Sequence, residues 1–517
     1  MKITTRILTC LIALLMFVSL FAACTTNPEN PSDTTTPDQQ SGNNPSSQNP
    51  GGDTSENTPG TSAEPTEQEL NVPTIGNTYS SYTYNILATT NKMGDSDLYY
   101  TSFDGISGSA VSDALYNRAL LMKDRYGVDV VVNIPNSPKD TLTNTIASGD
   151  YVCDIAMLSG RDSFSVALMG YLIDLNSLDE LNLSASYWDQ RIQKEYAVGE
   201  KLFFLEGDYT ILDELRTYVC VYNDNLYRNL GFYDKYGSPY EMVSTGKWTM
   251  DRMIEMTAGM YEDVNSNGIR DEDDKYGMVG ELTCAYYFFL GAGKQTIVNT
   301  NGQPTLVIDD SSSYSAIYDV ISKTMGMAIS DEVLLPQLLQ TSDVWGAASK
   351  VFEEDRALFR STALSAVTRL VNMSSDYGIL PIPAYAENQD GYYCWVSGVN
   401  HCPLTIPTTV KDSSRTAALT EALSYHSRYG SDTLYDAFYE VMKISKLCRQ
   451  PDDVAMLDLV FNSKTFDFDY TAQITGIEPS LYSIAKTRDM TSLNSAINGL
   501  KRAAGATLTR FLKQINK

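Results

Sequence analysis

Oxygen-bearing side chains recur at alternate positions of one short stretch, DVNSNGIRDEDD, which spans residues 263–274. An EF-type calcium loop needs such ligands at alternate positions, a backbone carbonyl at its seventh position and a glycine at its sixth. Gly268 stands at the sixth position. The predicted Ca²⁺ ligands are Asp263, Asn265, Asn267, the carbonyl of Ile269, Asp271 and Asp274. This pattern predicts a structural calcium site.

Two features of this loop indicate a structural role rather than a sensing role. Asp274 stands where sensor loops carry a longer, bidentate glutamate, so the affinity should be modest, in the roughly millimolar range of extracellular sites. No second copy lies nearby, so the paired switching unit of a calcium sensor is missing. The alternative is an acidic turn that binds no metal.

The first residues predict export. Lys2 and Arg6 precede a short apolar run, and Ala22 and Ala23 precede Cys24, which is the pattern of a signal peptide over residues 1–23. The stretch LFAAC resembles the lipobox of bacterial lipoproteins, although Phe21 replaces the usual leucine. That resemblance implies that Cys24 is lipidated. The alternative is an ordinary secretory signal with an incidental cysteine.

Residues 24–81 are dominated by Pro, Ser, Thr, Asn and Gly and have few apolar side chains. Such a segment cannot bury enough surface to offset its ordering entropy, so we expect a disordered tether. The protein would then work at the extracellular face of the cell membrane, held there by its lipid anchor. A formal net charge of -26 argues against nucleic acid as a partner.

Cysteine and histidine usage limits the chemistry. Six cysteines remain beyond Cys24, without the paired short spacings of a metal site, and a core of this size does not need disulfides. We expect buried free thiols. Only His401 and His426 are present, which is too few histidines for a histidine-based metal site and for most nucleophilic mechanisms that use a histidine base. We expect both histidines to be structural.

After the tether, the pattern alternates between strands and helices. YTYNILATT, VDVVVNI and CDIAMLS predict strands, and the segments between them, SDALYNRALLMKDRYG and KDTLTNTIASGD, predict helices. Alternation of this kind indicates an α/β fold with a parallel sheet. The tail, LNSAINGLKRAAGATLTRFLKQINK, predicts a terminal amphipathic helix with late basic residues.

Several further segments occur in a familiar order: YVCVYNDNLYRNLGF, GKWTMDRMIEMTAGM, FEEDRALFRST and DYGILPIPAY. In this order they resemble the family 1 extracellular solute-binding proteins, which are similar to maltose-binding protein and capture sugars for ABC importers. The resemblance runs from about residue 82 to the end. It implies a type II periplasmic-binding-protein clamshell of two α/β lobes, and carbohydrate and ABC permease subunits as partners. We expect the chain to act as a monomer.

The resemblance also implies lobe boundaries. The first lobe would hold residues 82–216 plus 357–392, and the second would hold 217–356 plus 393–517, which include the calcium-type loop. The chain would cross between lobes near 216–223, 352–358 and 392–397.

Ligands in open α/β sheets bind beyond the carboxyl ends of the strands, and in a clamshell they bind between the lobes. Arg161 and Asp162 follow such a strand, Arg216 lies at the first crossing and Trp395 at the third. CAYYFFLGAG resembles the second-lobe segment that stacks a tyrosine on a sugar, which makes Tyr286 or Tyr287 the candidate. The alternative for any one of these tyrosines is a place in the core.

We expect a binding protein rather than an enzyme. One alternative is a secreted, calcium-stabilised glycoside hydrolase, which would also use acids and aromatic residues. The two-lobe pattern and the missing rhythm of eight strand–helix units argue against a barrel enzyme. A second alternative is a clamshell receptor for adhesion or signalling without transport. The sequence does not specify the sugar, its length or its linkage.

Overall fold

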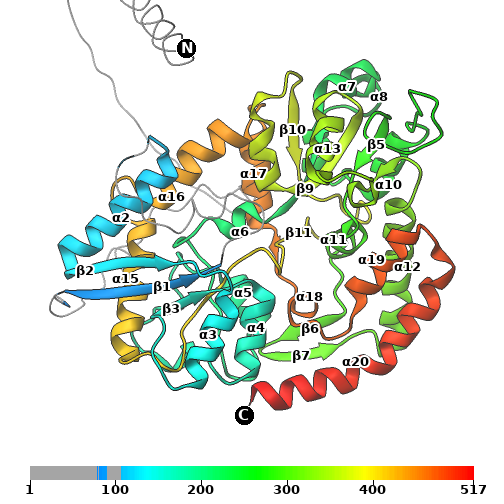
Figure 1. Ribbon diagram of the computed structural model, residues 1–517. Coiled ribbons are helices and arrows are strands. Elements are labelled where there is room, and N and C mark those ends of the chain that lie inside the picture. The colour runs from blue at the N-terminus through cyan, green and yellow to red at the C-terminus, as the bar shows by residue number, and fades with distance from the viewer. Residues whose placement is uncertain (1–78, 80, 90–105, 107, 517) are drawn as a thin grey trace, which may run out of the picture. The chain divides into compact units, whose positions relative to one another are not determined.

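The computed structural model describes residues 79, 81–89, 106 and 108–516, and all of them belong to one compact unit, Glu64–Lys517. The predicted signal peptide, Cys24 and residues 24–78 of the predicted tether lie outside the described residues. Helices and strands alternate along the described chain, as Figure 1 shows, which confirms the predicted α/β class.

A four-stranded sheet is built mainly from the first part of the described chain, with the strand order β12-β3-β1-β2. Its strands are β1 (Tyr82–Ala88), β2 (Val128–Asn133), β3 (Ile155–Met157) and β12 (Leu404–Thr405). β1 is parallel to both β2 and β3, whereas the late strand β12 runs antiparallel to β3. The parallel core is the arrangement that the alternating sequence pattern predicts.

Helices connect and flank these strands: α2 (Ala110–Tyr126), α3 (Pro138–Ala147), α4 (Gly160–Leu168) and α15 (Ser413–Arg428). α2 ends at Gly127, whose left-handed conformation (φ 71°) a glycine adopts at no steric cost. α4 begins at Ser159, whose hydroxyl accepts a hydrogen bond from the backbone N–H of Asp162. This cap places the start of α4 directly after the carboxyl end of β3.

A larger, five-stranded sheet has the order β10-β4-β9-β5-β8. Its strands are β4 (Tyr218–Asn223), β5 (Tyr276–Val279), β8 (Val333–Leu334), β9 (Ala357–Ala363) and β10 (Tyr377–Leu380). β4 pairs antiparallel with β9 and β10, while β5 is parallel to β8 and β9. Every residue of β4 and β9 is buried, as expected for strands at the centre of a covered sheet.

Helices of the same region surround this sheet. They are α7 (Asp224–Asn229), α8 (Phe232–Tyr236), α9 (Pro239–Ser244), α10 (Met250–Thr257), α11 (Cys284–Gly291), α12 (Ser311–Ala328), α13 (Val344–Glu353) and α14 (Leu364–Val367). α11 is apolar around its whole circumference, and all of its residues are buried. A helix of this composition must lie inside the molecule, and it packs against α12 and α19.

The strand pairing differs from the predicted lobe boundaries. Residues 357–392 were assigned to the first lobe, but β9 and β10 belong to the larger sheet with β4 and β5. β8 and β9 lie in the same sheet, so the chain does not change sheets near 352–358. Residues 393–517 were assigned to the second lobe, yet β12 pairs in the smaller sheet and α15 packs on α2. Strand pairing is a long-range property, which local sequence patterns do not specify.

β11 (Cys394–Trp395) pairs with β13 (Lys464–Thr465) in a short two-stranded ladder that is not hydrogen-bonded into either sheet. The ammonium group of Lys464 forms ion pairs with Asp189 (3.1 Å), Asp213 and Glu214 (3.0 Å). These carboxylates come from the segment that precedes β4. The buried ammonium group of Lys464 therefore connects the ladder to that segment. β6 (Ile297–Thr300) and β7 (Gln303–Leu306) form a separate hairpin.

The remaining elements are mostly helical. They are η2 (Leu175–Ser177), α5 (Gln190–Tyr196), α6 (Leu212–Leu215), η3 (Pro336–Leu338), η4 (Thr368–Asn372), α16 (Leu434–Asp436), the π-helical η5 (Ala437–Leu447), α17 (Asp453–Asn462), α18 (Phe468–Ala472), α19 (Ile477–Thr487), η6 (Met490–Ser492) and α20 (Leu493–Ile515). α20 is the predicted amphipathic terminal helix, and its apolar stripe is buried. Among the described residues, no helix combines the length and apolar character needed to cross a membrane. The six cysteines in the described residues are free thiols, as expected.

Candidate functional site

Five aromatic side chains from four elements meet at one place, which we call the aromatic cluster. They are Tyr218 of β4, Tyr286 and Tyr287 of α11, Trp395 of β11 and Tyr470 of α18. The ring of Trp395 lies 4.9 Å from that of Tyr218, 4.7 Å from that of Tyr470 and 6.2 Å, nearly parallel, from that of Tyr287. The structure therefore brings together three of the residues that the sequence singled out: Tyr286, Tyr287 and Trp395.

Hydrogen bonds fix the tyrosines of the aromatic cluster. The hydroxyl of Tyr286 donates to Asp467 Oδ1 (2.7 Å), and that of Tyr218 donates to Glu281 Oε2 (3.1 Å). Tyr286, Tyr287 and Trp395 are each at most 1% exposed. Their flat faces are covered by one another, so a ligand could reach them only after the surrounding elements part.

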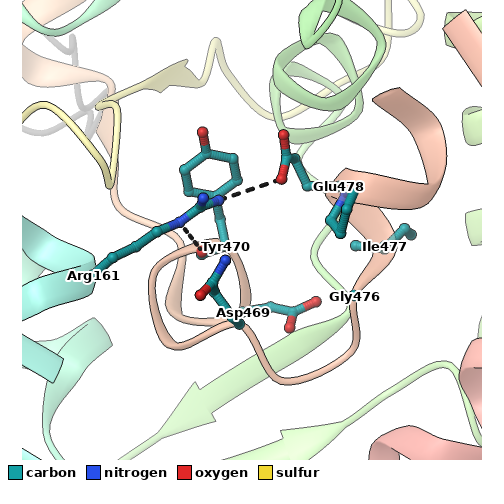
Figure 2. A pocket seen from close by; sticks show the side chains of 8 residues that line it. Arg161, Asp469, Tyr470, Gly476, Ile477 and Glu478 are labelled. Carbon is teal, nitrogen blue, oxygen red and sulfur yellow. Dashed lines mark hydrogen bonds and ion pairs between the residues drawn. The ribbon is translucent and has the colours of Figure 1, made fainter. Parts of the chain in front are cut away.

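Arg161 reaches this region from the first turn of α4. Figure 2 shows its guanidinium lying against the ring of Tyr470, 4.3 Å from the centroid, with Glu478 of α19 on the other side. Arg161 Nη2 lies 3.3 Å from Glu478 Oε2, and Nε donates to the backbone carbonyl of Tyr470 (3.3 Å). One cation thus joins α4, which flanks the smaller sheet, to the α18–α19 segment. In that segment, α19 packs against α11, a helix beside the larger sheet.

A pocket opens beside this ion pair. It is lined by Arg161, Asp469, Tyr470, Gln473, Gly476, Ile477, Glu478 and Pro479. Its volume is about 30 Å³, which is far below the roughly 300–1,000 Å³ of pockets that enclose a small-molecule ligand. In this arrangement it would admit only part of a larger ligand.

Three buried carboxyl groups surround the aromatic cluster. Burial raises the pKa of Glu281 to about 7, although the Tyr218 hydroxyl and the charge of Arg360 act in the opposite direction. Burial and the neighbouring charge of Asp469 likewise raise the pKa of Asp467 to about 7. Asp469 accepts hydrogen bonds from the hydroxyls of Thr296 and Thr475 and from the backbone N–H of Thr475. These groups offer hydrogen-bond acceptors in a region of low polarity.

The other two predicted ligand residues do not join the aromatic cluster. Asp162 accepts a hydrogen bond from the Ser159 hydroxyl (3.0 Å) and forms an ion pair with Lys139 (3.3 Å). Arg216 is fully buried just after α6, and its backbone carbonyl accepts a hydrogen bond from Ser397. Asp162 thus serves the start of α4, and Arg216 lies in the interior near the segment that follows β11.

Tyr218, Glu281, Tyr470 and Glu478 were not singled out in the sequence. Tyr218 is the first residue of the quoted segment YVCVYNDNLYRNLGF, and Glu281 stands three residues before the quoted segment CAYYFFLGAG. Their nearness in sequence to Arg216 and to Tyr286 was the only available signal. Tyr470 and Glu478 lie in FDYTAQITGIEP, which has no local pattern that marks a site. They reach Arg161 across more than 300 residues of sequence, a relation that only the tertiary fold creates.

Both histidines have structural partners, as expected. His401 is fully buried, and its Nδ1 lies 2.7 Å from Glu206 Oε1; burial lowers the pKa of His401 to about 3. His426 Nε2 lies 2.8 Å from the hydroxyl of Tyr126. Both remain neutral at physiological pH.

The calcium-type loop lies between α10 and β5 and is folded by its own side chains. Asp263 Oδ2 accepts a hydrogen bond from the N–H of Gly268 (2.8 Å), and Asn267 Oδ1 accepts one from the N–H of Ile269 (2.6 Å). Gly268 has a φ of 71°, the left-handed conformation that the sharp turn requires. Asp274 is fully buried and accepts hydrogen bonds from the N–H groups of Val264 and Asp271.

The oxygen donors of this loop suit a hard cation such as Ca²⁺. Their present arrangement is looser than a formed metal site. Among the described residues, no three acidic, histidine or cysteine side chains are grouped closely enough to hold a metal ion. In addition, the side-chain amide of Asn267 donates to Asp271 Oδ2 (2.9 Å). Binding would require this amide to turn and the carboxylates to draw together.

Comparisons with known proteins bear on the fold. No protein-family model and no curated protein matches the sequence. Solved structures do match. One is an ABC substrate-binding protein from Listeria monocytogenes in complex with cycloalternan, with a TM-score of 0.53 and 12% identity over 82% of this chain and 99% of that one.

Two further structures are similar over nearly their whole length. A cyclo/maltodextrin-binding protein complexed with maltotetraose has a TM-score of 0.52 and 12% identity, covering 83% of this chain and 96% of that one. The apo form of RafE from Streptococcus pneumoniae has a TM-score of 0.51 and 16% identity, covering 83% and 98%. These similarities show that the chain has the two-lobed α/β fold of periplasmic-binding proteins.

Proposed function

We propose that this protein is the substrate-binding protein of an ABC importer and captures a carbohydrate between its two lobes. The observation that carries the proposal is the aromatic cluster, together with Arg161, at the place where elements of both sheets meet. The similar structures from Listeria monocytogenes and the cyclo/maltodextrin-binding protein are complexes with oligosaccharides, which supports the same ligand class here.

The composition of the site suits a neutral, hydroxyl-rich ring. Aromatic faces offer flat apolar area to the C–H face of a sugar, and tyrosine adds a hydroxyl at the edge. The planar guanidinium of Arg161 can donate several hydrogen bonds in a fixed geometry. Glu281 and Glu478 can accept hydrogen bonds from sugar hydroxyls.

Ligand binding requires the site to open. An oligosaccharide exceeds the pocket of about 30 Å³ beside Arg161, and the rings of Tyr286, Tyr287 and Trp395 are covered. In the proposed mechanism, a sugar would displace the contacts of Arg161 with Tyr470 and Glu478 and insert between the lobes. Closure around the sugar would then restore the burial of the rings.

The direct test is a panel of oligosaccharides screened for thermal stabilisation of the protein. A ligand that binds only the folded state increases the free energy of unfolding by mass action, by about 2.7 kcal/mol at a hundredfold excess over Kd, and therefore raises the melting temperature. Arg161→Ala should weaken the response to the identified sugar at least tenfold in Kd.

Arg270→Ala is the matched control. Arg270 also stacks on a tyrosine ring (Tyr261, 4.2 Å) and pairs with a carboxylate (Asp331, 3.2 Å), but it lies beside the calcium-type loop. It should bind the sugar as the wild type does. A panel without any stabilising carbohydrate, or equal loss in both variants, would contradict the proposed site.

The absence of turnover is a separate part of the proposal. Glu478 is paired with Arg161, and Asp467 and Asp469 are held by several donors, so the carboxyl groups near the pocket are engaged in structural contacts. Prolonged incubation with the bound oligosaccharide should therefore yield no cleavage products. Steady turnover abolished by Glu478→Gln would instead favour a glycoside hydrolase.

We further propose that the protein is exported and anchored through Cys24 at the extracellular face of the cell membrane. Fractionation of cells should find the wild type with the membranes and Cys24→Ser in the soluble fraction. Sugar uptake that depends on both the protein and two permease subunits would support transport, whereas binding without uptake would favour a receptor for adhesion or signalling.

A further inference from the structure

A second cavity lies away from the aromatic cluster, beside the C-terminal ends of α4 and α20. Its volume is about 730 Å³. The lining residues are Ala167, Leu168, Met169, Gly170, Tyr171, Leu172, Lys201, Phe203, Arg510, Lys513, Gln514 and Ile515. The contacts proposed above for the sugar involve none of these residues.

The cavity is cationic in a chain that is strongly anionic. Lys201, Arg510 and Lys513 line it, and no carboxylate does. Within the part of the chain that the structure describes, none of these three cations forms an ion pair. α20 carries basic residues and no acidic residue from Leu493 to Ile515, although the chain has a net charge of -26.

The negative ends of the two helices offset only part of this positive charge. Each helix presents about half a negative charge at its C-terminus, so the ends of α4 and α20 together contribute about one negative charge. Gln514 Nε2 already donates to the carbonyl of Leu168 at the end of α4 (3.1 Å). Against the three cations, roughly two positive charges remain without compensation.

The inner wall of the same cavity is apolar. Leu172, Phe203 and Ile515 line it, and each is at most 6% exposed. Arg510 can hold a phosphate or carboxylate through two parallel hydrogen bonds, and the lysines add point charges. An anionic head group on an apolar body would complement both parts of the cavity.

We propose that this cavity binds an organic anion, with a phosphate or carboxylate on Lys201, Arg510 and Lys513 and an apolar body against Phe203 and Leu172. Such an anion has two sources, a small soluble molecule or the head group of an anionic lipid. Both carry a phosphate or carboxylate on an apolar body. The first would reach the cavity from solution, and the second from a membrane surface.

The experiment uses the full chain and phenyl phosphate as the probe, titrated by calorimetry at constant ionic strength. Saturable one-site binding is expected. Arg510→Gln/Lys513→Gln should weaken it at least tenfold. Lys501→Gln/Arg502→Gln removes the same charge from the same helix outside the cavity lining, and it should change Kd less than twofold. The melting temperature of each variant without probe reports any effect on folding.

Vesicles distinguish the two sources. Binding to vesicles of 30% phosphatidylglycerol in phosphatidylcholine that phenyl phosphate displaces, and that Arg510→Gln/Lys513→Gln abolishes, assigns the cavity to a lipid head group. Binding of phenyl phosphate without vesicle binding assigns it to a soluble anion. The proposal is wrong if neither probe binds, or if both double variants lose binding equally. The sugar response measured on the same variants tests the proposed function separately.

Discussion

Arg161 shows how one side chain can connect two parts of the fold. Its guanidinium contacts Tyr470 and Glu478, and the two charged side chains retain only 26% and 13% exposure. Partial burial makes such a pair stronger than an exposed ion pair, although the loss of hydration offsets part of the gain. The contact is therefore strong enough to order the site and weak enough for a ligand to replace.

This argument predicts a measurable coupling between the two residues. In a double-mutant cycle of Arg161→Gln and Glu478→Gln, urea unfolding should give a coupling of about 0.5–1 kcal/mol. The control cycle is Arg270→Gln with Asp331→Gln, because Asp331 is 80% exposed, and its coupling should be close to zero. Additive effects of Arg161 and Glu478 would show that their contact contributes nothing to stability.

Glu281 predicts a dependence of stability on pH. Burial raises its pKa from 4.5 to about 7, so between these values the folded state keeps a proton that the unfolded state has lost. Stability from this group is thus fully present below pH 4.5 and is lost as the pH rises through 7. The loss is on the order of 3 kcal/mol.

The check is urea unfolding at pH 5 and pH 8. Glu281→Gln should lose less stability than the wild type between these two values, because its side chain carries no titratable proton. Glu241→Gln, at an exposed position, should keep the wild-type dependence. An unchanged pH dependence in Glu281→Gln would overturn the assignment.

At the scale of elements, the calcium-type loop is pre-folded by hydrogen bonds such as those of Asp263 and Asn267. We propose that it binds a structural Ca²⁺ ion that draws its carboxylates together. The ion would stabilise the connection between α10 and β5 without contributing to ligand capture.

Calcium should therefore raise the melting temperature of the wild type relative to the protein in chelator. Asp263→Ala should remove this difference, because it deletes the first ligand position. Asp273→Ala is the control within the same loop: it removes an equal charge, and Asp273 pairs with Lys350 (3.1 Å) at a position that is not a ligand. Identical melting of the wild type in calcium and in chelator would rule out the site.

Elements with a strong local pattern were predictable from the sequence. α2, α3 and α20 occur where apolar spacing placed them, and β1, β2 and β3 form the predicted parallel core. The partner strands of β9 and β10 were not predictable. A fully buried strand such as β9 has the same sequence pattern whichever sheet it joins. The same limit applies to the candidate site. Trp395 was named for its place at a predicted crossing and Tyr286 for the resemblance of its segment, whereas Tyr470 and Glu478 reach Arg161 only through tertiary contact.

At the scale of the whole molecule, the proposed function requires the two sheets and the segments between them to move before a sugar can enter. The pocket beside Arg161 measures about 30 Å³, and the aromatic cluster is closed. Trp395 is 1% exposed, so Trp395→Ala would leave a cavity and cost stability as well as affinity. Arg161 variants separate these effects better.

Solution scattering should detect this motion. Because a sugar can enter only an open form, the ligand-free protein in solution must sample open arrangements. The radius of gyration should therefore decrease when the identified sugar is added and the lobes close on it. A sugar that gives no thermal stabilisation is the control and should leave the radius unchanged. A constant radius with the bound sugar would mean that the ligand enters without domain motion.

The buried thiols have a practical consequence for kinetics. Cys284 begins α11 and Cys394 precedes Trp395, and burial raises the pKa of each, to about 12 and about 11 respectively. Both thiols therefore remain protonated and unreactive while the aromatic cluster is packed. A chromogenic thiol reagent would modify them only during transient openings, so the rate of modification counts opening events in the native ensemble. The half-buried Cys448 would react regardless of such openings, so Cys448→Ser isolates the slow modification of the buried thiols.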